Sequence, residues 1–428
     1  MGIGPEIDEG RDYIGYSHAL ELVRSHIHPL DVEYVSLEVA AGRILAEDLR
    51  AIVDSPSLDV SLKDGYAVSL ECLQRTDPGK TVELKVTGTA HAGDMEILSV
   101  TPGCAVKVTT GAPLPQGTHA VIAAELCNEQ DNRLFFSEAV YPGQNILRAG
   151  TDVSTGEPIG TKGEWLSPGK LGFFAAAGLH QIRVYRMPRV SILATGDEVA
   201  PPGAALRPGQ VYASNLVTLA SWLHSFGVRP SFQVVPDSRD RIEANIWTLL
   251  SGTEQLLISG GAWGSERDLV VDILSTSGWK KVFHRVRMGP GKAVAFGLLE
   301  QKPIFCLPGG PPSNEMAFLQ LALPAVLWQA GWKGMPFRTV LARIDADLVG
   351  RRIDWTQFIH ARLTQDGQGT LWATPHRTES RLQSMALTEC LIPIPEGTEG
   401  YTRGQVVEVQ VLSSRIAFGV QHFPESDL

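Results

Sequence analysis

The clearest pattern along the chain lies between residues 185 and 332, where short apolar runs alternate with longer segments of helical hydrophobic spacing. The apolar runs predict strands in VSILATG, SFQVVPD, QLLISGG, KAVAFG and PIFCLPGG. Helices are predicted in NLVTLASWLHSFG, RDRIEANIWTLLSG, RDLVVDILSTSG and SNEMAFLQLALPAVLWQAG. Strands that alternate with helices of this length indicate an α/β domain with a mostly parallel, doubly wound sheet.

Two other regions have the pattern of β structure. From Ala51 to about Gly150, turns rich in glycine, proline and asparagine separate the runs TVELKVTG, CAVKVTTG, HAVIAAEL and NRLFFSEAV. This pattern predicts a β-rich domain. After Gly334, a small β-barrel or sandwich is predicted from TVLARIDADL, IDWTQFIHARL, GTLWAT, ECLIPIP and QVVEVQVL.

The segments that flank the first β-rich region are mixed. Residues 16–28 have apolar positions near helical spacing, and the following DVEYVSLEVAAGRILAEDL suggests a strand and then a short helix. Residues 152–184 fit a turn and a small-residue helix that ends near Gly178. We therefore expect these segments to lead the chain into and out of the β-rich region.

Composition narrows the class of protein. With 428 residues, 43% hydrophobic and 20% charged, the chain is expected to be globular, with about three domains at roughly 150 residues each. The net charge of -10 argues against a broad nucleic-acid surface. The N-terminal sequence lacks a basic-then-apolar signal, and no apolar run reaches the ~18 residues of a membrane span, so we expect a cytoplasmic protein. Five scattered cysteines without a CxxC pair indicate reduced thiols.

Candidate chemistry follows the predicted strands of the α/β domain. Ligands of doubly wound sheets bind outside the carboxyl ends of the strands, so the loops after the strands should converge. LATGDE, VVPDSRD and LLISGGAWGSERD provide Glu198, Asp237, Gly260, Gly261, Ser265 and Asp268. RVRMGPGK and CLPGGPPSN provide Arg285, Lys292, Gly309, Gly310 and Ser313.

The two glycine-rich turns, SGGAWGSERD and PGGPPSN, are expected to bind a phosphate-bearing ligand. Glycine lets backbone N–H groups approach an anion closely, and a helix N-terminus adds about half a positive charge. The alternative for either turn alone is a tight turn without a ligand. Lys292 has two interpretations, a phosphate contact in the PGK turn or a solvated surface lysine.

Three carboxylates beside an anion site need a mediator. Glu198, Asp237 and Asp268 would repel a phosphate unless a hard cation such as Mg²⁺ lies between them, so the pattern implies a metal. The alternative for Asp237 and Asp268 is that each caps a helix. In the β-rich region, Asp64 in SLKDGYAV and Thr110 in VTTGAPLPQG precede turns that, on their residues alone, are ordinary structural loops.

A series of motifs in fixed order carries a family resemblance. SLDVSLKDGYAV, VTTGAPLPQGTHAVIAAE, NILRAGTDVSTGE, VSILATGDEV, GQVYASN, LISGGAWGSERD and GPGKAVAFG followed by CLPGGPPS resemble the molybdopterin molybdenumtransferase family, the MoeA type. Each motif is weak alone, but their order and spacing are specific. The resemblance spans nearly the whole chain.

The resemblance implies a multidomain protein with both α/β and β domains. The four implied domains are an elongated linker module (34–54 and 152–184), an inserted β-rich domain (55–151), a molybdopterin-binding α/β domain (1–33 and 185–332) and a C-terminal β-barrel (333–428). It also implies a homodimer in which the β domain of one subunit faces the α/β domain of the other. A molybdopterin adenylyltransferase is a further candidate partner.

The family's reaction inserts molybdate into adenylylated molybdopterin and releases AMP with the help of a divalent cation. By resemblance, Asp64 and Thr110 lie on the inserted-domain side, and Glu198, Asp237 and Asp268 hold metal and substrate. Pro308 and Pro311 shape the phosphate turn, whereas Arg285 and Lys292 contact anionic groups.

The chain departs from the family pattern at the site itself. Gly289 stands where the family usually has the first lysine of KPGK, Gly310 replaces the asparagine of PGNP, Trp263 lies in the first glycine turn, and Leu147 is commonly arginine. Two interpretations fit: a working transferase with compensating groups such as Arg287 and Lys63, or a divergent paralogue that binds without inserting metal. We favour the first because all three carboxylates are retained. The rival functions are a molybdopterin adenylyltransferase and a non-catalytic scaffold.

Overall fold

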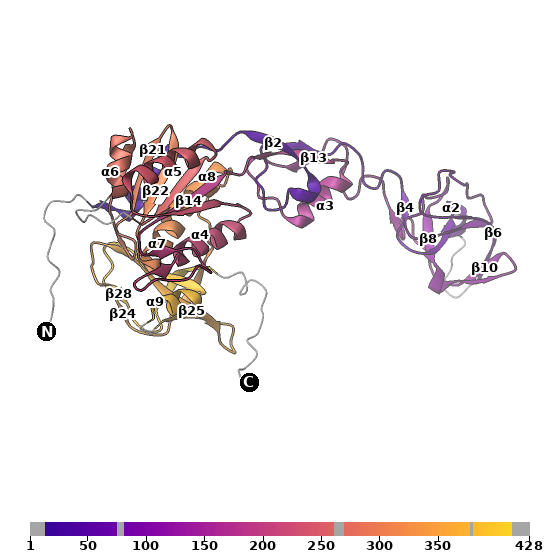
Figure 1. Ribbon diagram of the computed structural model, residues 1–428. Helices are drawn as coiled ribbons and strands as arrows, with labels where there is room; N and C mark the ends of the chain where they lie inside the picture. The colour runs from indigo at the N-terminus through magenta and orange to yellow at the C-terminus, as the bar shows by residue number, and fades with distance from the viewer. Residues whose placement is uncertain (1–12, 75–80, 261–268, 377–379, 413–428) are drawn as a thin grey trace. The chain divides into compact units, whose positions relative to one another are not determined.

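The computed structural model describes residues 13–74, 81–260, 269–376 and 380–412 (Figure 1). Two compact units divide the chain, one formed by Met1–Glu33 with Tyr185–Leu428 and the other by Tyr34–Val184. No helix in the described ranges has the length and apolar character needed to cross a bilayer.

The first unit contains the predicted α/β sheet. Its order is β17-β14-β18-β22-β21-β19, and the first four strands are parallel. Their bounds are β14 (Val190–Thr195), β17 (Ser231–Val235), β18 (Gln255–Ser259), β19 (Lys280–His284), β21 (Ala295–Leu299) and β22 (Lys302–Leu307). β21 and β19 are antiparallel additions. The prediction of a mostly parallel α/β sheet is confirmed; β19, with its sequence KKVFH, was not predicted.

Alternate side chains of each central strand enter two different cores. Ile192 of β14 and Phe305 of β22 pack in one core, whereas Leu193 and Cys306 pack in the other. The first core also takes residues of α1 (Tyr16–His26), α4 (Ser214–Ser225) and the segment α7 (Pro311–Ala317), π-helix (Phe318–Ala322) and α8 (Leu323–Gln329). The second is covered by α5 (Arg239–Ser251) and α6 (Leu269–Thr276). Helices on both faces make the sheet doubly wound, as predicted.

The C-terminal part of this unit is a closed five-stranded barrel. Its strand order is β25-β26-β23-β29-β27, and an antiparallel pairing of β25 with β27 closes it. The strands are β23 (Thr339–Ile344), β25 (Thr356–Gln365), β26 (Leu371–Pro375), β27 (Cys390–Ile394) and β29 (Val406–Val411). All five predicted strands are present, and the barrel alternative is the one that the structure shows. Smaller elements are β24 (Leu348–Val349), β28 (Gly400–Tyr401) and α9 (Arg381–Ala386).

Two short strands extend this barrel sheet. β20 (Val286–Gly289) pairs in parallel with β25, and β1 (Ile14–Gly15) pairs in parallel with β20. The sequence RVRMG had been expected only to supply loop residues. Because Gly289 is the register partner of Gln357, the turn that follows β20 lies against the barrel.

The second unit contains a six-stranded sheet of order β8-β5-β7-β6-β10-β9. The strands are β5 (Gly65–Val68), β6 (Val82–Ala90), β7 (Cys104–Val108), β8 (Ala120–Ala123), β9 (Asn128–Gln130) and β10 (Arg133–Phe136). A β-rich region between Ala51 and Gly150 is thereby confirmed. Short additions are β4 (Val60–Ser61), β11 (Ile146–Leu147), α2 (Leu70–Gln74) and a 3-10 turn, η2 (Ala124–Leu126).

The flanking segments of the second unit pair with each other. Their strands are β2 (Val32–Ser36), β3 (Leu49–Arg50), β12 (Pro158–Gly160) and β13 (Gln181–Tyr185). The predicted helix α3 (Pro168–Ala176) is present, with Gly178 at a positive φ just beyond its end. The short helix expected after β2 is reduced to a 3-10 turn, η1 (Leu37–Val39), because Ile44 and Leu45 instead form bridges with Trp165 and Val184.

Ion pairs between the largely buried Glu254 and two more exposed arginines link the starts of β14 and β18. The Glu254 side chain, 13% exposed, accepts hydrogen bonds from the Arg189 backbone N at 2.7 Å and from the Arg189 and Arg186 guanidinium groups. Burial raises the pKa of Glu254, but the hydrogen bonds from Arg189 and Arg186 outweigh it and lower the pKa to about 2. The carboxylate is therefore more stable in the folded chain than in the unfolded one.

Glu254→Gln should lower the free energy of unfolding of this unit by about 2 kcal/mol at pH 7. Since the folded pKa lies below the ordinary value of 4.5, this contribution is complete above pH 4.5 and is lost as pH falls toward 2. Urea unfolding followed by tryptophan fluorescence should show that the difference in free energy of unfolding between the wild type and Glu254→Gln becomes smaller from pH 5 to pH 3. Asp272→Asn, which breaks the exposed pair with Arg239, is the control and should change stability by less than about 0.5 kcal/mol. A difference in unfolding free energy that does not change with pH would contradict the lowered pKa of Glu254.

Candidate active site

The carboxyl ends of three parallel strands lie side by side in the α/β sheet. Ala194 near the end of β14 pairs with Ser259 of β18, and Ser259 pairs with Leu307 of β22. The loops that leave these strands contain most of the residues predicted for the site. The expected convergence of the loops therefore follows from the strand register.

Two asparagines anchor the turn after β22. Asn314 Nδ2 donates to Ser259 Oγ at 3.0 Å and to the Pro308 carbonyl at 2.8 Å. Asn215 Nδ2 donates to the same Ser259 Oγ at 3.3 Å and to the Gly309 carbonyl at 2.8 Å. Asn215 and Ser259 had not been singled out, although both lie in the quoted motifs GQVYASN and LISGG. These four hydrogen bonds fix the glycine turn on the end of β18.

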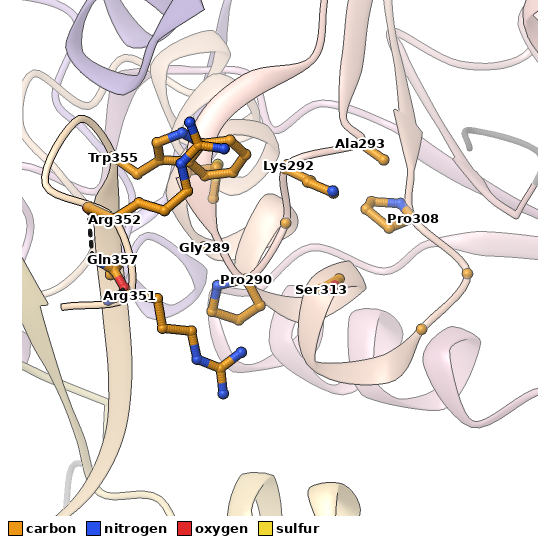
Figure 2. Close-up of a pocket in the computed structure, with 14 residues that line it drawn as sticks. Gly289, Pro290, Lys292, Ala293, Pro308, Ser313, Arg351, Arg352, Trp355 and Gln357 are labelled. Carbon is orange, nitrogen blue, oxygen red and sulfur yellow. Dashed lines mark hydrogen bonds between the residues drawn. The ribbon is translucent and has the colours of Figure 1, made fainter. Parts of the chain in front are cut away.

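A cavity of about 700 Å³ opens beside this turn (Figure 2). One wall comes from the end of β20, the turn that follows it and the start of α7, and the other wall comes from the barrel. The lining residues are Met288, Gly289, Pro290, Gly291, Lys292, Ala293, Pro308, Gly309, Gly310, Ser313, Arg351, Arg352, Trp355 and Gln357. Three of them are basic and none is acidic, so the lining favours an anion.

Five of the predicted substrate residues meet at this cavity, namely Lys292, Pro308, Gly309, Gly310 and Ser313. Pro311 begins α7 but is not among the lining residues. Arg285 is not there either. Its side chain is buried, with the guanidinium carbon 5.9 Å from the centre of the Tyr13 ring.

The turn at Gly291 explains how the cavity wall packs on α7. Gly291 has φ +113°, and a Cβ there would lie 3.0 Å from Met288 Cε and 3.3 Å from the Ala317 backbone N. Only glycine allows this backbone conformation and this approach without strain. The glycine therefore positions Lys292 next to the start of α7.

Gly260 meets a similar requirement at the end of β18. Its φ is +108°, and an added Cβ would lie 2.6 Å from the Thr195 carbonyl oxygen and 2.9 Å from Thr195 Oγ1. Among the residues that the structure describes, this buried Thr195 hydroxyl has no hydrogen-bond partner. The closeness of the β14 backbone is a sufficient reason for glycine at this position.

Two predicted metal ligands are exposed at neighbouring strand ends. Glu198 and Asp237 follow β14 and β17, whose last residues Thr195 and Val235 are register partners. Glu198 folds back over Gly196, and the Asp237 N–H donates to Asp197 Oδ1 at 3.1 Å. Within the described ranges, no group of three or more acidic, histidine or cysteine side chains forms a metal site. Asp268, Gly261 and Ser265 lie outside those ranges, so the three-carboxylate site stays a prediction.

The second unit brings Asp64 and Thr110 together. Asp64 Oδ1 accepts from the Thr110 backbone N at 2.7 Å and from its hydroxyl at 3.0 Å. The backbone hydrogen bond is the larger of the two effects, and together they lower the pKa of Asp64 below its ordinary value. Both residues are exposed, so an ionised carboxylate is held in a fixed position at the surface of this unit.

Comparison with known proteins identifies the family. Three family profiles match in order: the MoeA N-terminal region (domain I and II) over residues 14–178, the probable molybdopterin binding domain over 191–328 and the MoeA C-terminal region (domain IV) over 351–412. The molybdopterin molybdenumtransferase of Haemophilus influenzae is 30% identical over 387 residues, which cover 89% of this chain and 94% of that protein. The chain belongs to the molybdopterin molybdenumtransferase family.

Other relatives agree with this family. The molybdopterin molybdenumtransferase of Synechococcus elongatus is 29% identical over 409 residues, covering 93% of this chain and all of that protein. Among solved structures, the molybdopterin biosynthesis moeA protein of Pyrococcus horikoshii has a TM-score of 0.79 and 30% identity, covering 94% of this chain and 100% of that one. The matching N-terminal and C-terminal regions do not favour an adenylyltransferase or a scaffold.

Two of the positions at which this chain departs from the family pattern lie in the cavity wall. A Cβ on Gly289 would lie 3.7 Å from Gln357 Cγ, and a Cβ on Gly310 would have nothing within 4 Å. The backbone thus leaves room for a side chain at both positions, and the glycines leave that space to the cavity. Trp263 lies outside the described residues.

The two groups expected to compensate are engaged elsewhere. Arg287 donates to the Tyr13 carbonyl at 2.9 Å and pairs with Glu396 at 2.8 Å. Lys63 pairs with Glu125 at 2.8 Å. Neither is among the residues that line the cavity.

Proposed function

We propose that this chain inserts molybdate into adenylylated molybdopterin and releases AMP, forming molybdenum cofactor. The family membership supports the transfer of molybdenum to molybdopterin. The observation that carries the proposal is the cavity, whose lining is basic, lacks carboxylates and includes five residues predicted to bind substrate. A tetrahedral oxyanion or a phosphoryl group is the ligand that suits such a lining.

The carboxylates suit a cation, whereas the basic cavity suits an anion. Glu198 and Asp237 stand at the exposed strand ends, where the oxygen donors fit Mg²⁺, a metal that binds to one or two carboxylates and to substrate phosphates. In the proposal, these two residues and Asp268 hold Mg²⁺. When bound, the metal would neutralise phosphoryl charge and polarise the bond that breaks as AMP leaves.

The chain's own groups bind and orient the substrate. Lys292 and the turn Pro308–Gly309–Gly310 contact anionic groups, and Asn215 with Asn314 keeps that turn in place. Ordering the reacting groups in one geometry lowers the entropic part of the barrier. The bound substrate would thus be oriented by groups that are already fixed in the fold.

We further propose that the protein is a homodimer. In a homodimer, Asp64 and Thr110 of one subunit would complete the site of the other as catalytic residues. The four-domain division and a cytoplasmic location belong to the same proposal, as does a molybdopterin adenylyltransferase that supplies the substrate. Arg285, Gly261 and Ser265 remain proposed substrate contacts, and Pro311 remains a proposed shaping residue of the turn.

Metal-dependent release of AMP from adenylylated molybdopterin tests the proposal. Asp268→Asn and Asp237→Asn should each reduce the rate about 10- to 100-fold and raise the Mg²⁺ concentration needed for half-maximal rate, because each removes one charged oxygen ligand. Asp240→Asn, an exposed carboxylate three residues after Asp237, is the control and should keep the wild-type rate. Full activity of Asp268→Asn would refute its role as a metal ligand. Accumulation of adenylylated product from ATP and molybdopterin, without insertion, would favour the adenylyltransferase.

A further inference from the structure

A buried acidic side chain of α7 faces a histidine of the barrel. Glu315 is 7% exposed, and its Oε1 accepts a hydrogen bond at 2.9 Å from the indole N–H of Trp222 in α4. Its other carboxylate oxygen, Oε2, lies 3.7 Å from Nε2 of His360 in β25. This separation is longer than a hydrogen bond. The buried carboxylate therefore lies close to His360 without a direct hydrogen bond to it.

A second imidazole lies beside His360. The His376 backbone N–H donates to the His360 carbonyl at 3.1 Å, next to the register pair Ala361 and Pro375. Residues that face each other on adjacent strands have their side chains on the same face, so the two imidazoles are neighbours. Among the described residues, Nε2 of each ring is buried and lacks a hydrogen-bond partner. Burial, and then the charge of His360, lower the pKa of His376, so His376 is neutral at pH 7.

Other titratable groups belong to the elements packed around the two rings: Arg362 in β25, Glu389 and Cys390 at β27, Arg381 of α9, His224 of α4 and Tyr16 of α1. Burial raises the pKa of the thiol and of the phenol, so both are uncharged at pH 7. The α4 and α9 groups are exposed to solvent. The guanidinium of Arg362 lowers the pKa of His376, and the carboxylate of Glu389 raises it. A proton on His360 would thus face the Glu315 carboxylate directly.

The contact between Glu315 and His360 joins the two elements that form opposite walls of the cavity. Ser313, two residues before Glu315, lines one wall, and Gln357, three residues before His360, lines the other. Three residues of a strand span only about 10 Å, so the contact lies close to the cavity. Through its hydrogen bond with the indole of α4, Glu315 is also tied to the helix whose Asn215 anchors the glycine turn. A change in the length of this contact would therefore alter the distance between the walls.

We propose that Glu315 is a positioning residue that pairs with His360 when this imidazole is protonated, and that the ion pair holds the barrel against α7 in the geometry that binds substrate. The inference deepens the proposed function and rests on it. A buried carboxylate is stabilised by a partner that carries positive charge and donates a hydrogen bond, and a protonated imidazole does both. Imidazoles ordinarily change charge between about pH 5 and pH 8. Substrate affinity is then higher at the acidic end of this range than at the basic end.

Equilibrium dialysis of the full-length protein against adenylylated molybdopterin, at about pH 6 and about pH 8, tests the inference. The Kd of the wild type should be about three- to tenfold higher at the higher pH, because the ion pair is then lost. Glu315→Gln keeps the length of the side chain and an acceptor oxygen for the indole N–H, but it cannot form the ion pair. Its Kd should not change with pH and should be close to that of the wild type at the higher pH. A wild-type Kd that does not change with pH, or a Glu315→Gln variant that keeps the change, would overturn the inference.

His360→Gln tests the other member of the pair and decides the matter if Glu315→Gln does not fold. Glutamine cannot take up a proton in this range, so the dependence of the Kd on pH should disappear in this variant as well. If the dependence persists, another group is responsible for it and the proposed role of Glu315 is wrong.

The matched control removes a contact between the same helical segment and the barrel that involves no titratable group. Gln320 of the π-helix donates from Nε2 to Gln410 Oε1 of β29 at 2.7 Å. Gln410→Met should keep the full change of Kd with pH, whatever its effect on the affinity itself. Loss of the pH dependence in this control would attribute the effect to a general loosening of the barrel and overturn the role of Glu315.

The rate of AMP release separates this inference from the proposed function. If the Kd values follow the predicted pattern but no AMP is released at either pH, the proposed reaction fails while the inference about binding stands. If AMP is released and Glu315→Gln has the Kd and KM of the wild type at both pH values, the reaction stands and the inference is overturned.

Discussion

Asn314→Asp should destabilise the α/β unit by about 3–5 kcal/mol and remove ligand binding at the cavity. Asn314 is only 1% exposed, and its amide donates to Ser259 Oγ and to the Pro308 carbonyl. Aspartate has nearly the same shape but cannot donate when ionised, so it would place a buried charge against the Pro308 carbonyl oxygen. The glycine turn would lose one of its two anchors.

Urea unfolding and equilibrium dialysis with molybdate measure both parts of this expectation. The matched control is Asn245→Asp, because Asn245 Nδ2 donates to the Arg241 carbonyl on the exposed surface of α5. That control should change stability by less than about 0.5 kcal/mol and leave binding unchanged. A similar loss of stability in the two variants would show that the hydrogen bonds of Asn314 are not what holds the turn.

Gly260→Ala should cost about 2–4 kcal/mol, the second large effect. At φ +108° an L-residue is strained, and the new Cβ would lie 2.6 Å from the Thr195 carbonyl oxygen, so β14 and β18 would have to separate. The melting temperature should fall by several degrees, and AMP release should fall with it, since the loops of both strands belong to the proposed site.

Gly309→Ala is the informative comparison. Gly309 does not have a positive φ, and a Cβ there would have nothing within 4 Å. Its melting temperature should equal that of the wild type, and any defect should be confined to ligand affinity. If Gly309→Ala unfolds as readily as Gly260→Ala, the distinction between a glycine needed by the fold and one that faces the ligand is wrong.

Local periodicity was sufficient to predict the five barrel strands and every strand of the α/β sheet except β19, because their apolar runs are continuous or alternate regularly. β20 lacked such a signal. Its four residues, VRMG, are a strand only because they pair with β1 from the start of the chain and with β25 from the barrel. Pairing between distant segments leaves no mark in the local pattern.

The same long-range pairing explains why two residues of the cavity wall were not predicted. Arg351 and Gln357 belong to a segment that has the pattern of an ordinary barrel strand, and only the contact of β20 with β25 makes them part of the wall. Arg285 is predicted from the sequence as an anion contact, and in the structure its guanidinium carbon lies 5.9 Å from the centre of the Tyr13 ring. The N-terminal strand β1 brings Tyr13 over its guanidinium.

The order of the motifs along the chain was more informative about the site residues than the chemistry of each motif taken alone. Asp64 and Thr110 had no functional signal in their own residues and were assigned by resemblance, and the structure joins them by two hydrogen bonds. The sequence did not show that Ser259 accepts hydrogen bonds from two asparagines, because a serine before two glycines is common in turns. Its role depends on the side chains of Asn215 and Asn314, which lie 44 and 55 residues away in sequence.

The central claim is that the chain transfers molybdenum to molybdopterin. Its most direct test is the molybdenum content of the pterin product after incubation of the full-length protein with adenylylated molybdopterin, Mg²⁺ and molybdate. We predict about one molybdenum per AMP released, with saturation in molybdate. Tight binding of the adenylylated pterin with neither AMP nor molybdenum-loaded product, at any molybdate concentration, would contradict the claim.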